Sequence, residues 1–110
     1  MDLLIKVYKR VAAVQPKGRV DSNTAPELEE ALVKLQGEGQ NHIVLDLSEI
    51  EFLSSAGLRV MVSTMKNLRK SAGDLVVASP NQRARDVLRL AGLDSVFSIY
   101  ETREAAIASI

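Results

Sequence analysis

Short apolar runs alternate with segments of helical period along the whole chain, and this alternation restricts the fold more than any other feature. The run at residues 42–47 is almost continuously apolar and β-branched, as in a strand that is covered on both faces. Strands of this kind that are joined by helices form largely parallel sheets with right-handed crossovers. The predicted strands are 3–7, 11–14, 42–47, 75–78 and 96–100, and the predicted helices begin near residues 24, 55, 80 and 102. The sequence therefore predicts one α/β domain over residues 1–110.

The predicted sheet is mixed and largely parallel, with four to five strands and about four helices. Residues 9–10 separate two strands that are close enough to form an antiparallel hairpin. The alternation of apolar and polar residues over 3–7 predicts that the first of these strands is half-buried. Pro16 and Gly18 are expected to end the second strand.

Local capping signals mark the expected helix starts. Thr24 lies three residues before Glu27, which predicts a capping box. Ser79 and Pro80 predict a cap followed by the first helical residue. The second helix is expected to turn one apolar face to the core, formed by Leu58, Met61, Val62, Met65 and Leu68.

Composition excludes several kinds of site. The chain has no cysteine, which excludes disulfides, thiolate catalysis and cysteine–zinc sites, and His42 is its only histidine. It contains neither a phosphate-binding glycine loop nor a G-x-S-x-G nucleophile motif. Its 14 Lys+Arg balance its 14 Asp+Glu, whereas nucleic-acid-binding domains are usually basic. No apolar run approaches the roughly 18 residues of a membrane span. We therefore expect a cytoplasmic, non-enzymatic domain without a cofactor, metal ion or nucleic-acid partner.

The zero net charge is the sum of four unequal blocks. Residues 1–20 carry +4, residues 21–51 carry −7, residues 59–89 carry +5 and residues 90–110 carry −2. These blocks are either solvated faces that differ by chance or a polarised surface that orients a charged partner. The segment 52–58 has no charge and lies between the acidic and the basic block.

Two adjacent serines lie in this uncharged segment, at the predicted start of a helix. One serine is enough to cap a helix, which it does for about 1 kcal/mol, so capping explains only one of Ser54 and Ser55. The small residues Ala56 and Gly57 are expected to leave the first turn open to close approach. A phosphate there would meet free N–H groups and the positive end of the helix dipole. The fold would tolerate that phosphate, while a docked partner would experience its charge.

Two blocks of this sequence resemble the STAS domain family, in particular bacterial anti-sigma-factor antagonists. The first block reads LDLS at 45–48 and FLSSAGL at 52–58. The second reads GRVDS at 18–22 and precedes the first predicted helix. The resemblance covers essentially the whole chain and implies a STAS-like fold.

The resemblance also implies a switch between partners. In that family the unphosphorylated antagonist binds an anti-sigma factor that is also a serine kinase, and this binding releases the sigma factor. Phosphorylation of one serine ends binding, and a metal-dependent serine phosphatase resets the cycle. The family pattern Asp-Ser-[Ser/Thr]-Gly places the phosphorylated serine at Ser55. Ser54 then stands where the family has aspartate, and Ala56 where it has a second hydroxyl residue.

The residues expected to bind the partner surround this serine pair. They are Asp21, Ser22, Ser54, Ser55, Ala56, Gly57, Arg59 and Ser63. The replacement of the family's aspartate leaves two alternatives open. Ser54 could be the phosphate acceptor, or the domain could be an unphosphorylated scaffold or accessory subunit in a signalling or transport complex.

Overall fold

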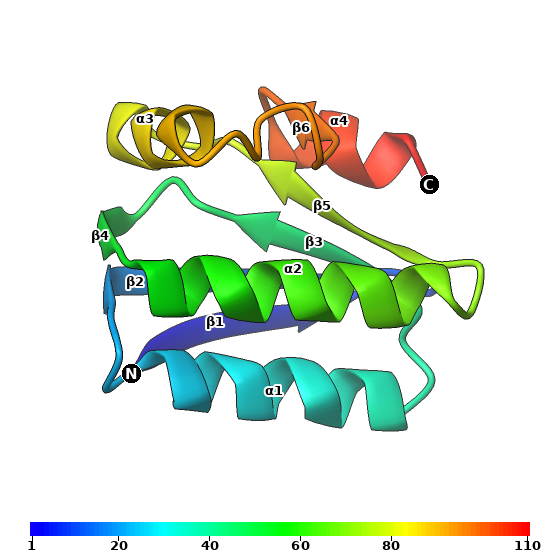
Figure 1. Ribbon diagram of the computed structural model, residues 1–110. Coiled ribbons are helices and arrows are strands. Elements are labelled where there is room, and N and C mark those ends of the chain that lie inside the picture. Colours follow the sequence, from blue (N-terminus) through cyan, green and yellow to red (C-terminus); the bar gives the residue numbers. More distant parts are fainter.

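Residues 1–110 form a mixed six-stranded sheet with helices on both faces in the computed structural model (Figure 1). The strands are β1 (Asp2–Val7), β2 (Ala12–Val20), β3 (His42–Asp46), β4 (Ile50–Leu53), β5 (Asp74–Ala78) and β6 (Ile99–Tyr100). The helices are α1 (Ala25–Gly37), α2 (Ser55–Arg69), α3 (Gln82–Leu90) and α4 (Arg103–Ala108). β1 is antiparallel to β2, and every other strand pair is parallel. The predicted α/β class and mixed sheet are confirmed.

The strand order is β1-β2-β3-β5-β6, with β4 paired to the last part of β2. The larger buried cluster lies between the sheet and α1, α2 and α3, and the smaller one lies under α4. α1 and α2 run side by side over the first of these faces (Figure 1). Because β2, β3, β4 and β5 are parallel, their carboxyl termini lie at the same end of the sheet, and α2 begins there.

Two strand predictions differ from the structure. The sheet has six strands instead of four to five, because residues 50–53 form β4. Only Ile50 and Leu53 of β4 are buried, so its pattern has neither the alternation nor the continuous apolar run by which a strand is recognised. The last strand contains two residues rather than all of 96–100.

The second strand was predicted to end at Pro16 and Gly18, which is wrong, because β2 passes through both. Its pairing with β3 covers Ala12–Val14, and its pairing with β4 begins at Gly18. Pro16 therefore lies where β2 changes its parallel neighbour, a position where a missing N–H costs no ladder hydrogen bond. Gly18 has a φ of 84° at the irregular start of the β4 pairing, a conformation that glycine adopts readily.

The first strand was predicted to be half-buried, which is also wrong. Leu3 is partly buried against the larger core cluster, but Leu4, Ile5 and Val7 are exposed. The main strand contacts of α1 are with β2, so no helix packs closely on the outermost strand.

Two helix starts lack the side-chain caps expected of them. The Thr24 hydroxyl donates to the Arg19 carbonyl oxygen (2.8 Å) and accepts from the Asp21 N–H (2.9 Å), so it does not form a capping box with Glu27. Glu27 instead accepts a hydrogen bond from the terminal amine of Met1 (3.1 Å). α3 begins two residues after Pro80, because Asn81 and not Ser79 supplies the cap that accepts from Ala84 N–H (2.9 Å).

A partly buried ion pair ties α4 to the carboxyl end of β3. Asp46 is 5% exposed, and its Oδ2 accepts from the Arg103 side chain at 3.1 Å (Nε) and 3.0 Å (terminal nitrogen). Its Oδ1 accepts from the Ser48 N–H at 3.0 Å and thereby orders the turn that leads to β4. Asp46 and Arg103, which are 57 positions apart, thus connect α4 to the turn that precedes β4.

We predict that Arg103→Met lowers the free energy of unfolding by about 3 kcal/mol, because it leaves the buried Asp46 carboxylate without its cation. Arg85→Met is the matched control, since the Arg85–Glu101 pair is exposed and should contribute less than about 1 kcal/mol. Urea denaturation measures both values. Equal losses in the two variants would show that the Asp46–Arg103 pair does not anchor α4.

Candidate functional site

The junction between β4 and α2 contains a single residue, Ser54. Its N–H donates to the Val20 carbonyl oxygen of β2 at 2.9 Å, which fixes the backbone as it leaves the sheet. Its hydroxyl accepts from the Gly57 N–H at 3.3 Å and caps the helix. Ser54 is half-buried and has a structural role.

Ser55 is the first residue of α2 and is exposed. Its side chain makes no hydrogen bond within the protein, so the hydroxyl is free to react or to contact a partner. The unpaired N–H groups of the first helical turn give this end of α2 a partial positive charge. No acidic side chain lies in that turn to offset it.

The glycine in the first turn of α2 serves the core instead of an outside partner. Gly57 is buried, and a Cβ at this position would lie 2.7 Å from Val20 Cγ1 and 2.8 Å from Leu53 Cδ1. The expectation that Gly57 opens the turn to a partner is therefore wrong, because its open side faces β2 and β4. Ala56 remains half-exposed beside it.

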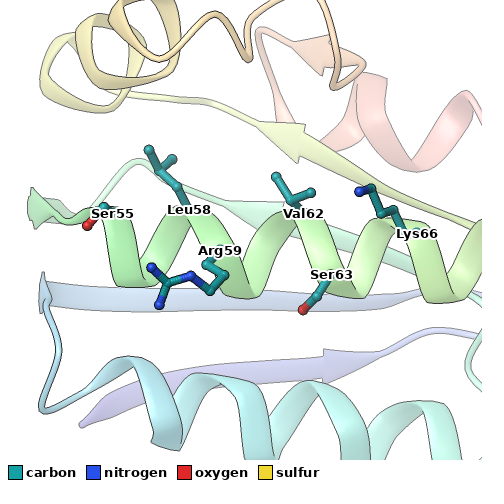
Figure 2. A pocket seen from close by; sticks show the side chains of 6 residues that line it. All are labelled: Ser55, Leu58, Arg59, Val62, Ser63 and Lys66. Atoms are coloured by element: carbon teal, nitrogen blue, oxygen red, sulfur yellow. The ribbon is translucent and has the colours of Figure 1, made fainter.

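A shallow groove of about 390 Å³ runs along α2 from Ser55. It is lined by Ser55, Leu58, Arg59, Val62, Ser63 and Lys66. Figure 2 shows Leu58 and Val62 on one side of the helix and Arg59 and Ser63 on the side of α1. The prediction that Leu58 and Val62 face the core is only partly correct, since both are half-exposed at its margin. The groove thus combines an apolar strip with two cations and two hydroxyl groups.

Arg59 also lines a second cavity, of about 280 Å³, between α1 and α2. Ser22 and Ala56 line it with Glu29 of α1, so three expected binding residues, Ser22, Ala56 and Arg59, share one cavity. Glu29 belongs to the acidic block and Arg59 to the basic block. The helical parts of the two blocks are therefore neighbouring stripes of one layer rather than opposite faces.

Asp21 lies in the loop before α1, and its carboxylate is held within that loop. Its Oδ1 accepts from the N–H groups of Asn23 (2.9 Å) and Thr24 (3.1 Å). The hydrogen bond from Thr24 N–H, followed by that from Asn23, holds the pKa of the Asp21 carboxyl below its usual value. Arg19 adds a weak ionic contact at 3.6 Å. Asp21 thus orders the loop that presents the exposed Ser22.

Two further surface features were not predicted from the sequence. Arg19 of β2 stacks over Phe52 of β4, with 4.4 Å from the guanidinium carbon to the ring centroid, and Phe52 is 38% exposed. Lys66 lies at the far end of the groove. The spacing of Leu58, Val62 and Lys66 at every fourth residue is the signal that could have identified a surface stripe on α2.

Other site chemistries find no support in the structure. No group of three His, Cys, Asp or Glu side chains is arranged to hold a metal ion. His42 begins β3, at the end of the sheet opposite the serine pair. None of the helices combines the length and the apolar character needed to cross a membrane.

Comparison with known proteins identifies the family. The sequence model of the STAS domain matches residues 2–106. The chain is a STAS domain. BtrV of Bordetella bronchiseptica is 38% identical over 93 residues, which are 84% of this STAS domain and 80% of BtrV. The anti-sigma-F factor antagonist RsfB of Mycobacterium tuberculosis is 33% identical over 103 residues, 94% of this chain and 84% of RsfB.

Solved structures agree with this assignment. An anti-sigma factor antagonist from Mycobacterium paratuberculosis superimposes on this STAS domain with a TM-score of 0.89 and 32% identity, covering 99% of this chain and 92% of that one. The anti-sigma factor antagonist SpoIIAA shares the fold at 19% identity, in its unphosphorylated form (TM-score 0.84) and as the Bacillus protein in its phosphorylated form (0.78). These two superpositions cover 96% and 98% of this chain, and 93% and 98% of the SpoIIAA chains. The expected STAS family membership and STAS-like fold are confirmed.

We predict that Gly57→Ala lowers the free energy of unfolding by about 1–3 kcal/mol, because the added methyl group meets two buried side chains at less than 3 Å. Gly37→Ala is the matched control. It lies in the last turn of α1 with open space around its Cα and should be neutral or stabilising. Thermal and urea denaturation compare the two, and an unaffected Gly57→Ala would show that this contact relaxes without cost.

Proposed function

We propose that this STAS domain is an anti-sigma-factor antagonist whose binding is switched at Ser55. The observation that carries the proposal is the exposed, unbonded Ser55 hydroxyl at the start of α2, directly beside the groove on that helix. RsfB and the Mycobacterium paratuberculosis protein are named as antagonists of anti-sigma factors. By analogy, the unphosphorylated domain binds an anti-sigma factor and thereby releases the sigma factor.

The hydrogen bonds of the junction favour Ser55 over Ser54 as the phosphate acceptor. The Ser54 hydroxyl caps α2 through the Gly57 N–H, and its N–H is bound to Val20. Modification of Ser54 would have to break this cap, whereas Ser55 offers its hydroxyl at no cost to the fold. The two serines are therefore not equivalent acceptors, although Ser54 replaces the family's aspartate.

A phosphate on Ser55 would change the surface and leave the fold intact. It would add a charge of about −1.5 to −2 at a helix N-terminus, where anions are stabilised. Arg59 follows one turn later on the same groove and is placed to approach that phosphate. A partner that covers Leu58 and Val62 would have to desolvate the new charge, which opposes docking.

The proposed binding surface consists of Ser55 and the groove, with Ala56, Ser22 and Arg59 extending it toward α1. Asp21 and Ser54 support this surface through the loop and the cap they form. The proposed partners are an anti-sigma factor with serine-kinase activity and a metal-dependent serine phosphatase. The domain itself acts in the cytoplasm as a regulator and catalyses no step.

We predict that incubation with ATP and the cognate anti-sigma kinase adds one phosphate to the wild type and to Ser54→Ala, and none to Ser55→Ala. Intact-mass spectrometry measures the number of phosphates added to each chain. Ser71→Ala is the control for an exposed hydroxyl outside the groove and should be modified like the wild type. Phosphate on Ser55→Ala, or its loss in Ser54→Ala with the fold retained, would refute the assignment.

We also predict that Ser55→Asp weakens binding to the anti-sigma factor about tenfold or more, because it brings a desolvated charge to the interface. Ser55→Asn has a similar size without the charge and should bind within a few-fold of the wild type. Calorimetry measures both affinities, and circular dichroism checks the fold. Tight binding by Ser55→Asp together with no phosphorylation would identify a constitutive scaffold instead of a switch.

A further inference from the structure

β1 is the outermost strand of the sheet, and every residue in it except the partly buried Leu3 is exposed. Its only strand neighbour is β2. Leu4, Ile5 and Val7 are 54%, 44% and 56% exposed. The main strand contacts of α1 are with β2 and those of α4 are with β3, β5 and β6, so no helix packs closely on β1. An apolar edge strand of this kind is a template for pairing with another strand.

The hairpin determines which backbone groups face the free edge. The Tyr8 N–H donates to the Val11 carbonyl oxygen at 2.7 Å, so these two residues form a hydrogen-bonded pair. Hydrogen-bonded and non-hydrogen-bonded pairs alternate along an antiparallel ladder, and the register from Asp2↔Lys17 to Val7↔Ala12 has no irregularity. The even-numbered residues of β1 therefore bond to β2. The N–H and C=O groups of the odd-numbered residues point to the free edge.

We propose that β1 pairs with β1 of a second copy of this chain, antiparallel about a two-fold axis at Leu4. Because only the odd-numbered residues offer free backbone groups, Leu3 bonds to Ile5 of the second copy. Asp2 then lies opposite Lys6 on both sides of the axis, in non-hydrogen-bonded pairs, whose side chains are the closest. Opposite charges in such cross-strand pairs are stabilising.

The same register also pairs the apolar side chains of β1 with one another. Leu4 meets its own copy at the axis, and Leu3 meets Ile5. The backbone also allows registers centred on Leu3, Ile5 or Lys6. The first two place Asp2 opposite Leu4 or Tyr8, and the third places Lys6 opposite its own copy, so none of them pairs Asp2 with Lys6. Charge complementarity therefore selects the register centred on Leu4.

The dimer would join the two sheets into one and leave both proposed binding surfaces free. β1 is antiparallel to β2, so the amino terminus of β1 lies at the end of the sheet where α2 begins. The second copy runs in the opposite direction, which places the two starts of α2 at opposite ends of the joined sheet. Each dimer would thus present two outward-facing switch sites. The proposal does not depend on phosphorylation of Ser55.

Sedimentation equilibrium on the full chain tests the register through a charge swap. We expect a wild-type dimer whose population rises with concentration. Lys6→Asp places a carboxylate opposite Asp2 in both of the symmetry-related pairs. It should therefore raise the dimer dissociation constant about tenfold. Asp2→Lys should have a similar effect, and the double variant Asp2→Lys/Lys6→Asp should restore the wild-type value.

Lys9→Asp is the matched control, since it makes the same charge change in the turn outside the pair, and it should leave the dissociation constant unchanged. Circular dichroism confirms that every variant is folded, which matters for Asp2→Lys because Lys17 lies opposite it on β2. A monomer up to about 1 mM would overturn the proposal. So would a dimer that is insensitive to either single change, or a double variant that fails to recover. The Ser55→Ala protein should dimerise like the wild type whether or not the phosphorylation proposal holds.

Discussion

The close approach of Gly57 to Val20 and Leu53 holds the first turn of α2 against the sheet, and the geometry of the serine pair depends on it. Without a Cβ at residue 57, the first turn of α2 rests directly on the ends of β2 and β4. The Ser54 N–H can then reach the Val20 carbonyl oxygen, and its hydroxyl can reach the Gly57 N–H. These bonds leave Ser55 as the first residue that turns outward. A close backbone approach inside the core thus sets the exposure of a side chain on the surface.

The junction separates a structural hydroxyl from an available one within two residues. Under the proposed switch, the group that holds the fold differs from the group that would be modified. The groove next to Ser55 is apolar on one side and cationic on the other, and the segment 52–58 itself is uncharged. A phosphate would be the only charge in that segment. The neutral average of the sequence therefore conceals a local surface on which one added charge has a large effect.

Much of the fold could be predicted from the sequence, and the failures have a common cause. The run 42–47 and the amphipathic segments around it identified the central strands and the helices, since burial on both faces and helical period leave local patterns. β4 has no such pattern, and β2 continues through Pro16 only because its parallel neighbour changes there. The exposure of β1 depends on α1 packing over β2. Each of these features depends on a segment distant in sequence.

The sequence by itself determined the α/β class, the STAS resemblance and the serine pair at a helix start, because these reside in residue types and their spacing over a few positions. Only the tertiary structure decided which serine caps the helix, that Gly57 faces the core, and that Leu58 and Val62 line a groove. The ion pair between Arg103 and Asp46 is likewise visible only in the tertiary structure. The physical reason is that periodicity places a residue on a face of its own element. The neighbouring elements then decide whether that face is covered.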